Sequence, residues 1–449
     1  MVRPAATRAA GSRRQRPICS PRAPVNCAMK LSIATYRDLF AVNSRLVLFS
    51  FLMAMYSSFG QTYFVGVFGP QVQAEFGLSH TLWGTIYLLG TLASAVVMPF
   101  TGALIDRFRL QVFALAVAVL LVFACTFMSL VPGPVALVLA IFLLRHSGQG
   151  LASHASVTSM ARYFDRDRGR AIAIAAMGYT LGEAVLPFVA VLLIAVVGWR
   201  WTYGSAALFT ALTLIPMTMV LLRRHEEFHR KHVDQLENIH HDAKPTRPSW
   251  TRAQVLRDPR FYLLCPGILS SSLIVTAFFF HHLNVASAKG WSGEWITGTY
   301  ILYAGAGTIT MLMAGPLIDR FTAVRMTQFM LVPLIVSCLM LAGAEDKLTV
   351  VPYMLMLGIH SGLALTAISA LWAELYGVRH IGAIKSLYTA LMVFSSAIGP
   401  VIMGMLMDAG LSIAWACMLF GAYALIGNLL IVFALRLAPA ANSPPSTAS

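Results

Sequence analysis

The sequence predicts an all-α integral membrane protein with twelve transmembrane helices in two pseudo-symmetric six-helix halves. The chain has 449 residues, of which 58% are hydrophobic and 11% are charged, and its mean hydropathy is +0.72. So much apolar surface cannot be buried in one water-soluble core. Twelve apolar segments reach the ~20 residues that cross ~30 Å of hydrocarbon. The stretch GALIDRF at Gly102 also returns as GPLIDRF at Gly315, 213 residues later.

The first half is predicted to span residues 46–222. It follows an Arg-, Pro- and Ala-rich tail, 1–45, that lacks an apolar core of signal-peptide length. A transit peptide fits this composition, and a true start at Met29 instead of Met1 is an open alternative. The six expected spans are 46–67, 81–105, 112–131, 135–160, 170–196 and 200–222.

The second half is predicted to span residues 260–436. A charged, His-rich linker, 223–259, precedes it, and a tail, 437–449, with the composition of a disordered segment follows it. Its expected spans are 260–288, 293–318, 324–343, 349–375, 381–407 and 411–436. The 213-residue shift places the first span on the seventh, the second on the eighth and the fourth to sixth on the tenth to twelfth. Two halves of parallel topology are the simplest explanation.

The basic residues fix the predicted orientation. With a cytoplasmic N-terminus, 29 of the 33 Lys and Arg residues fall in inner loops and tails. Only Arg200, Lys289 and Lys347 fall in outer loops, and Arg145 lies inside a span. This is the positive-inside distribution, so both termini are expected in the cytoplasm of a cell whose inner membrane holds the protein. The net charge of +15 is therefore spread along a membrane face, which argues against nucleic-acid binding.

The repeated loop resembles a motif of the major facilitator superfamily of secondary transporters, a Gly-x-x-x-Asp-Arg signature between spans two and three. The matching residues are Gly102, Asp106 and Arg107 in the first half, and Gly315, Asp319 and Arg320 in the second. The resemblance covers roughly residues 40–440 and implies transport by alternating access. It also implies that both loops act as gates that latch the cytoplasmic side in the outward-open state. The alternative is that these charges only anchor the loops at the membrane interface.

A finer resemblance concerns the stretches GYTLGEAVLP, GWRWTYG and SWTRAQVLRDPRFY. They look like bacterial members near the monocarboxylate and oxalate/formate groups. The chain lacks the eighth-span arginine typical of the first group and the eleventh-span lysine of the second. These departures argue against a dicarboxylate or a standard monocarboxylate as the substrate.

Two ionisable residues lie near the predicted midplane. Charged groups inside spans are costly and mark a transport pathway by default. Arg145 is in the fourth span, and RHSGQG resembles the superfamily's Arg, Gln-Gly motif with one extra residue. Glu183 in the fifth span is at similar depth and is the expected partner and proton carrier. The alternative is a permanent ion pair that only holds spans together.

Further candidate substrate contacts are His146, Gln149, Tyr179 and His360. Gln149 is one α-helical turn from Arg145 and His146, so the three are expected on one face. His360 is the repeat mate of His146, and Tyr179 precedes Glu183 by one turn. Histidines and tyrosines inside spans more often pack than bind substrate, which is the alternative for each.

We predict a transporter and no enzyme, because the chain has no Walker A loop and no HExxH motif. The expected substrate is a small organic anion such as a carboxylate, carried with protons as symporter or antiporter by a monomer in the lipid bilayer. Proton-antiport efflux of drugs or metabolites is the alternative, and a non-transporting membrane sensor is an alternative of another class. No cofactor, metal or nucleic acid is expected.

Overall fold

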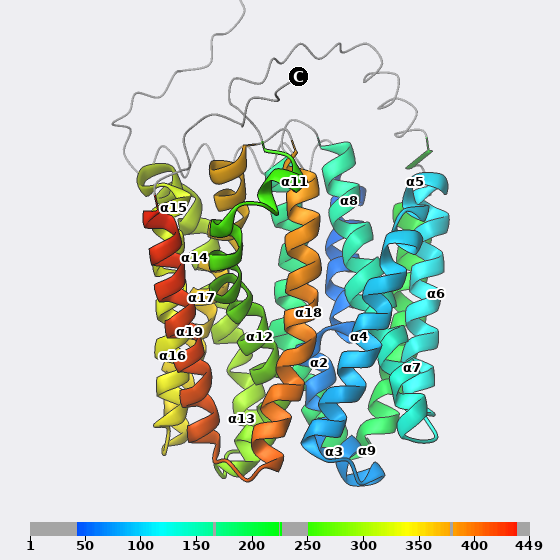
Figure 1. The fold of residues 1–449 in the computed structure, drawn as a ribbon. Helices are drawn as coiled ribbons and strands as arrows, with labels where there is room; N and C mark the ends of the chain where they lie inside the picture. The colour runs from blue at the N-terminus through cyan, green and yellow to red at the C-terminus, as the bar shows by residue number, and fades with distance from the viewer. Residues whose placement is uncertain (1–42, 165–167, 224, 227–249, 378–379, 438–449) are drawn as a thin grey trace, which may run out of the picture. The chain divides into compact units, whose positions relative to one another are not determined.

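The computed structural model describes residues 43–164, 168–223, 225–226, 250–377 and 380–437 (Figure 1). All regular structure among these residues is helical. Most of both predicted tails and most of the predicted linker lie outside the described residues, so the domain boundaries remain predictions. The described residues from Arg45 onward form one compact unit.

The first half begins with a helical stretch at residues 43–56. The elements that follow are η1 (Ser57–Gly60), α2 (Thr62–Val67), α3 (Gly69–Phe76), α4 (His80–Gly102), α5 (Leu104–Arg107), α6 (Leu110–Ser129), α7 (Pro134–Leu144), the π-helix η2 (Arg145–Ala152), α8 (Ser153–Tyr163) and α9 (Arg168–Leu221).

The second half begins after the short helix α11 (Arg252–Val255). Its elements are α12 (Pro259–Ala288), α13 (Gly293–Gly298), α14 (Tyr300–Phe321), α15 (Ala323–Phe329), α16 (Val332–Ala342), η3 (Lys347–Thr349), α17 (Val350–Tyr376), α18 (Ile381–Asp408) and α19 (Ile413–Arg436).

The twelve-helix, two-half fold is confirmed. Ten helices of the described residues are long and apolar enough to cross a membrane. One of them, α9, contains two spans that meet at Gly198, where φ is 78°. The first span is not the continuous helix that we expected at 46–67, because it changes to a 3₁₀ turn at Ser57 and breaks at Gln61.

Corresponding turns of the two halves have the same chemistry. Gly77 and Gly290, which are 213 residues apart, both have positive φ, at 62° and 70°. Glycine adopts this left-handed conformation without the penalty of a Cβ atom. Two residues later, Ser79 and Ser292 cap the next helices by accepting a hydrogen bond from the third backbone N–H of each. The repeat in the sequence is therefore also a repeat of turn structure.

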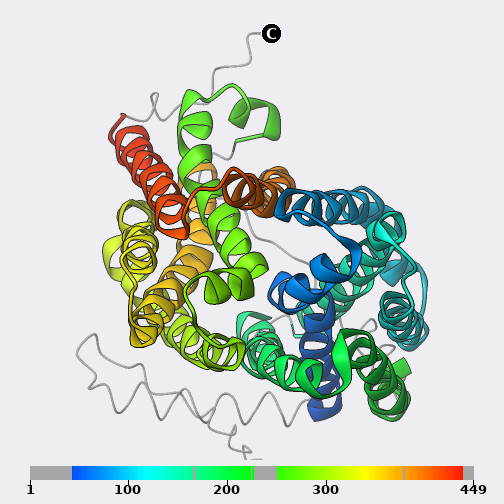
Figure 2. The same ribbon diagram turned by 90° about the horizontal axis from the view of Figure 1, so that it is seen from below.

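The two halves lie side by side, and their helices run along one common direction (Figures 1 and 2). We call the end that carries α3 and the turns at Gly77 and Gly290 the outer end, following the predicted topology, and the opposite end the inner end. Between the halves, α4 packs on α18, α2 on α12, and α9 on α13 and α14. In Figure 1, α4 and α18 meet near the outer end and diverge toward the inner end.

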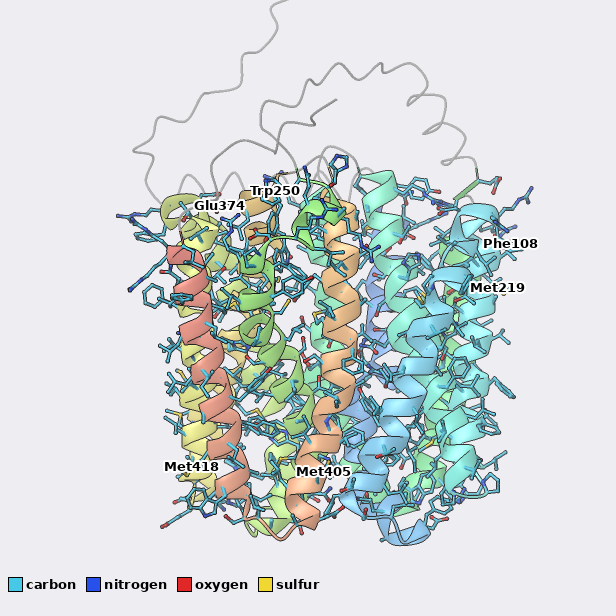
Figure 3. The ribbon with its side chains drawn as sticks, viewed as in Figure 1. Phe108, Met219, Trp250, Glu374, Met405 and Met418 are labelled. Atoms are coloured by element: carbon cyan, nitrogen blue, oxygen red, sulfur yellow. The ribbon has the colours of Figure 1, made fainter. Side chains whose placement is uncertain are left out.

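The outside of the bundle is apolar, as a surface solvated by lipid must be. Phe108, Met219, Met405 and Met418 point away from the helices in Figure 3, and each is exposed. The bilayer is therefore the natural environment of this fold.

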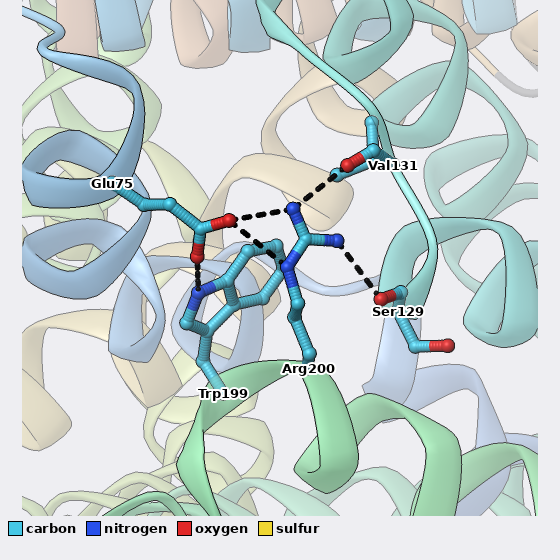
Figure 4. Close-up of polar contacts among 5 residues, drawn as sticks. All are labelled: Glu75, Ser129, Val131, Trp199 and Arg200. Carbon is cyan, nitrogen blue, oxygen red and sulfur yellow. Dashed lines mark hydrogen bonds and ion pairs between the residues drawn. The ribbon is translucent and has the colours of Figure 1, made fainter.

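A cluster of hydrogen bonds connects three segments at the outer end of the first half (Figure 4). Arg200 donates to Glu75 Oε1 at 2.6 Å, to the Ser129 carbonyl at 3.0 Å and to the Val131 carbonyl at 2.8 Å. Trp199 Nε1 donates to Glu75 Oε2 at 2.6 Å. The hydrogen bonds from Arg200 are the main cause that lowers the pKa of Glu75. Arg200, one of three basic residues predicted in outer loops, thus joins α3, α9 and the turn after α6.

Candidate functional site

The two copies of the Asp-Arg loop lie at the inner end but make different contacts. Asp106, in α5, forms an ion pair with Arg162 of α8, within its own half. Asp319, at the end of α14, is exposed and has no ion pair among the described residues. Instead, Glu374 of α17 accepts a hydrogen bond from the backbone N–H of Ala323, the first residue of α15, at 2.8 Å.

The other motif residues fit a loop at the protein surface. Arg107 and Arg320 are exposed, and the Arg320 guanidinium lies 5.2 Å from the ring of Phe321. Around Gly315 a Cβ atom would meet nothing within 4 Å, whereas at Gly102 it would lie 3.3 Å from Met98. The gating role of both loops therefore stays a prediction.

Arg145 is fully buried, with 1% of its surface exposed, and it lies against the break in the first span. Its Nη1 donates to the Gly60 carbonyl at 3.1 Å and to Thr62 Oγ1 at 3.3 Å. Its guanidinium lies 5.0 Å from the ring centroid of Tyr87, whose hydroxyl is hydrogen-bonded to Thr62. Its Nε has no hydrogen-bond partner. The guanidinium thus keeps unused donor capacity.

The π-helix at Arg145 explains the extra residue in RHSGQG. A π turn closes from i to i+5, one residue more than an α turn. Gly60 and Gly148 pack backbone against backbone here, because a Cβ on Gly148 would lie 2.7 Å from the Gly60 nitrogen; a Cβ on Gly60 would lie 2.0 Å from the Leu144 carbonyl oxygen. The widened turn of the fourth span therefore fits the break of the first span.

Arg145 and His146 do not point the same way as expected: Arg145 is hydrogen-bonded to the break of the first span, whereas His146 is turned toward α4. His146 is hydrogen-bonded to Thr101 Oγ1 at 3.1 Å and to Ser94 Oγ at 3.4 Å, both on α4. Its ring lines a cavity of about 320 Å³ between α4 and α6. Gln149 is half-buried, and the described residues give its side chain no hydrogen bond. Their role as substrate contacts remains a prediction.

Glu183 is buried, with 7% of its surface exposed, at the interface between the halves. The expected ion pair with Arg145 is absent from the described part of the chain, where the Glu183 carboxylate also has no hydrogen-bond partner. Four tyrosines, which we call the tyrosine cluster, lie within electrostatic range of this carboxylate: Tyr63, Tyr179, Tyr300 and Tyr303.

The tyrosine cluster joins both halves of the protein. The rings of Tyr63 and Tyr179 meet edge to face at 5.6 Å. Phe279 of α12 lies 6.5 Å from Tyr63, 5.0 Å from Tyr300 and 4.9 Å from Tyr303. Tyr179 also lies within electrostatic range of Arg145. Tyr179 is therefore within electrostatic range of both buried groups, Arg145 and Glu183.

His360 is held entirely inside the second half. Its Nδ1 donates to the Met330 carbonyl at 2.7 Å, so its Nε2 accepts from Ser271 Oγ, also at 2.7 Å. Both ring nitrogens are satisfied and the side chain is fully buried. His360 and His146 are thus each hydrogen-bonded within their own half, and substrate contact by His360 stays a prediction.

The outer end is sealed by glycines that sequence reasoning missed. A Cβ on Gly66 of α2 would lie 2.5 Å from a carbonyl oxygen of α12, and one on Gly84 of α4 would lie 2.8 Å from the Pro400 carbonyl oxygen. On Gly404 of α18 it would lie 2.6 Å from the backbone of the first residue of α4. These contacts become visible only when the two halves are placed together in space. For the break in the first span, the polar stretch SSFGQ was the one signal in the sequence.

The inner end is hollow between the same two helices. A cavity of about 720 Å³ separates the inner parts of α4 and α18 and is lined by residues that include Leu92, Pro99, Asp106, His154 and Phe394. The outer parts of α4 and α18 are therefore in contact, while their inner parts are apart.

Comparison with known proteins agrees with this fold. The family model of the Major Facilitator Superfamily matches residues 50–347 and 301–449. No curated protein matches the sequence.

Solved structures give similar matches at low sequence identity. A bacterial homolog of the human lysosomal transporter Spinster, inward-facing and occupied, shares 13% identity over 88% of this chain and 97% of its own, with a TM-score of 0.66. The nucleoside transporter NupG shares 14% identity over 88% and 99%, with a TM-score of 0.66. At such identities the likeness concerns the fold alone.

Proposed function

Because this chain belongs to the Major Facilitator Superfamily, we propose that it transports a small organic anion together with protons by alternating access. Membership makes the protein a multi-pass membrane transporter of a small molecule, and not an enzyme. The observation that supports the finer proposal is a pair of buried, opposite charges that do not touch, Arg145 and Glu183.

Arg145 offers a site for the anion. A buried cation without a counter-ion costs several kcal/mol, even after the protein relaxes. No acidic side chain pairs with Arg145 among the described residues, and its Nε donor is unused. A substrate carboxylate supplies both the missing charge and the missing acceptors, and the planar guanidinium can bind it through two hydrogen bonds.

Glu183 offers a site for the proton. A buried carboxylate without a cation or a hydrogen-bond donor favours its neutral form. The proposed cycle loads a proton on Glu183 and an anion on Arg145 from one side and releases both on the other. Tyr179 lies within electrostatic range of both Arg145 and Glu183, so in this proposal it couples binding of the anion to binding of the proton. The conformational change is then unfavourable when only the proton or only the anion is bound.

The alternative function is proton-antiport efflux, and the tyrosine cluster favours it. Aromatic faces attract organic cations, most strongly where water is excluded. A cationic solute could take the place of the proton at Glu183, with the rings of Tyr63, Tyr179, Tyr300 and Tyr303 around it. Under either function we propose a monomer in the cell's inner membrane with both termini in the cytoplasm.

Uptake into proteoliposomes distinguishes these functions. A labelled panel of short organic acids is offered under an inward proton gradient to the parent protein and to the Arg145→Ala variant. We expect gradient-driven uptake of at least one acid by the parent and its loss in the variant. The matched control is Arg436→Ala, which removes an exposed arginine at the end of α19 and should transport normally. Absence of uptake by the parent for every acid, with proton-driven export of an organic amine, would replace the proposal by the efflux alternative.

A further inference from the structure

The first turn of α4 receives part of its capping from the opposite half of the protein. The first backbone N–H groups of any helix lack partners within the helix. In α4, Ser79 accepts from the N–H of Leu82 at 3.1 Å. The two preceding N–H groups, of His80 and Thr81, donate to the carboxylate of Asp408 at 3.0 and 2.7 Å. Asp408 is the last residue of α18, so these two bonds cross between the halves.

The carboxylate suits this position electrostatically. A helix N-terminus carries a partial positive charge, which a negative side chain stabilises. Hydrogen bonds from backbone N–H groups to an ionised oxygen are also stronger than those between neutral groups. Asp408 is exposed, so water can solvate it when the contact opens. The capping therefore depends on the conformation and is not a permanent part of α4.

Neighbouring contacts also cross between the halves at this point. Asn284 of α12 donates its amide to Gln73 Oε1 of α3 at 3.1 Å and to His80 Nδ1 at 3.4 Å. One turn before Asp408, Gly404 brings the α18 backbone against His80. The carboxylate is thus the charged centre of a polar contact that exists only while the outer end is closed.

We propose that Asp408 is the latch of the outer end, a positioning residue that stabilises the outer-closed state by capping α4 across the two halves. When the outer end opens, His80 and Thr81 lose their acceptor in the protein and must bind water instead. Loss of an N-cap carboxylate commonly weakens a helix enough to change an equilibrium about fivefold to thirtyfold. Here the equilibrium that changes is the one between the outer-closed and outer-open states.

The test measures the distance across the outer end by double electron–electron resonance. Spin labels are placed at Val135→Cys, at the start of α7, and at Trp415→Cys, at the start of α19, because both positions are highly exposed. The six native cysteines are first replaced. With Asp408→Asn, which keeps one acceptor oxygen but loses the charge, we expect the ratio of the longer to the shorter distance to grow about twofold to fivefold. Asp408→Glu should restore most of the closed population.

Asp346→Asn is the matched control. Asp346 is also an exposed aspartate at the outer end that caps a helix, since it accepts from the Leu348 N–H at 2.8 Å, but it acts within its own half. It should leave the distance unchanged. Equal distances in the parent and Asp408→Asn, or equal changes in both Asn variants, would overturn the latch.

A second pair of variants keeps the test decisive if Asp408→Asn does not fold. His80→Pro deletes one of the two donors, and proline is tolerated in the first turn of a helix. Ser79 is already extended, with ψ of 163°, as a residue before proline should be. Compared with His80→Ala, which removes only the ring, His80→Pro should further increase the open population. No difference between the two would also overturn the proposal.

Discussion

A close backbone contact between α4 and α18 makes Gly84→Ala an informative single substitution. A Cβ atom at this position would lie 2.8 Å from the carbonyl oxygen of Pro400 and 2.9 Å from the backbone nitrogen of Val401. Both are backbone atoms of α18, which cannot rotate away as a flexible side chain would. The Pro400 oxygen also accepts a hydrogen bond from His281 Nε2 at 2.9 Å, so its displacement disturbs a second contact.

The expected magnitude follows from where the strain falls. Inserting a carbon into a packed contact costs about 1–3 kcal/mol. Alanine in place of glycine also stabilises the helix by about 0.5–1 kcal/mol, but α4 is helical in both states and this gain cancels. The clash exists only when α4 meets α18 at the outer end. The ratio of outer-closed to outer-open protein should therefore fall about 5- to 150-fold.

The spin-label pair at positions 135 and 415 measures this ratio directly. Gly84→Ala should increase the population with the longer distance, while Gly305→Ala in α14 should not, because nothing lies within 4 Å of the added atom there. Thermal unfolding should show both variants folded. A distance distribution for Gly84→Ala that equals that of the parent would refute the account of the outer seal.

Three further substitutions test other parts of the structure. Gly60→Ala places an atom 2.0 Å from the Leu144 carbonyl oxygen and should sharply reduce the yield of monodisperse protein in size-exclusion chromatography, whereas Gly204→Ala, with its nearest atom at 3.9 Å, should not. His360→Leu leaves the Met330 carbonyl without its donor and should cost about 1–3 kcal/mol of stability in thermal unfolding without changing the KM for substrate; a raised KM at unchanged stability would instead place His360 at the substrate. Glu75→Gln should lower the Tm at neutral pH, because a carboxylate whose pKa is lowered by folding stabilises the protein at pH values above its pKa in the unfolded chain. The Tm difference from the parent should vanish as the pH falls through the pKa of Glu75 in the folded protein. A Tm difference that does not depend on pH would contradict this role.

The sequence predicted what depends on composition and periodicity. Hydropathy located all twelve spans, since twenty apolar residues in a row have few alternatives to crossing a membrane. The repeat predicted corresponding structure, and Gly77 with Gly290 shows how closely the turns agree. Hydropathy could not detect the break at Gln61, because a broken span has the same composition as a continuous one.

The candidate site was harder to predict because it depends on which way side chains turn. Depth along the spans suggested that Arg145 and Glu183 would pair, but depth gives no direction around the helix axis. Arg145 is hydrogen-bonded to the break of the first span, whereas His146, the next residue, is turned toward α4. The glycine contacts and the Asp408 cap join residues of different halves, more than 300 positions apart for Asp408 and His80, and no local pattern encodes such a pairing.

The most direct test of proton coupling compares two transport modes in Glu183→Gln proteoliposomes, using the acid that the uptake panel identifies. A glutamine resembles the protonated carboxyl group but cannot release a proton. We predict that the variant still exchanges labelled for unlabelled substrate at a rate near that of the parent, while an imposed proton gradient no longer drives accumulation. Accumulation equal to that of the parent protein would contradict Glu183 as the proton carrier and, with it, the proposed mechanism.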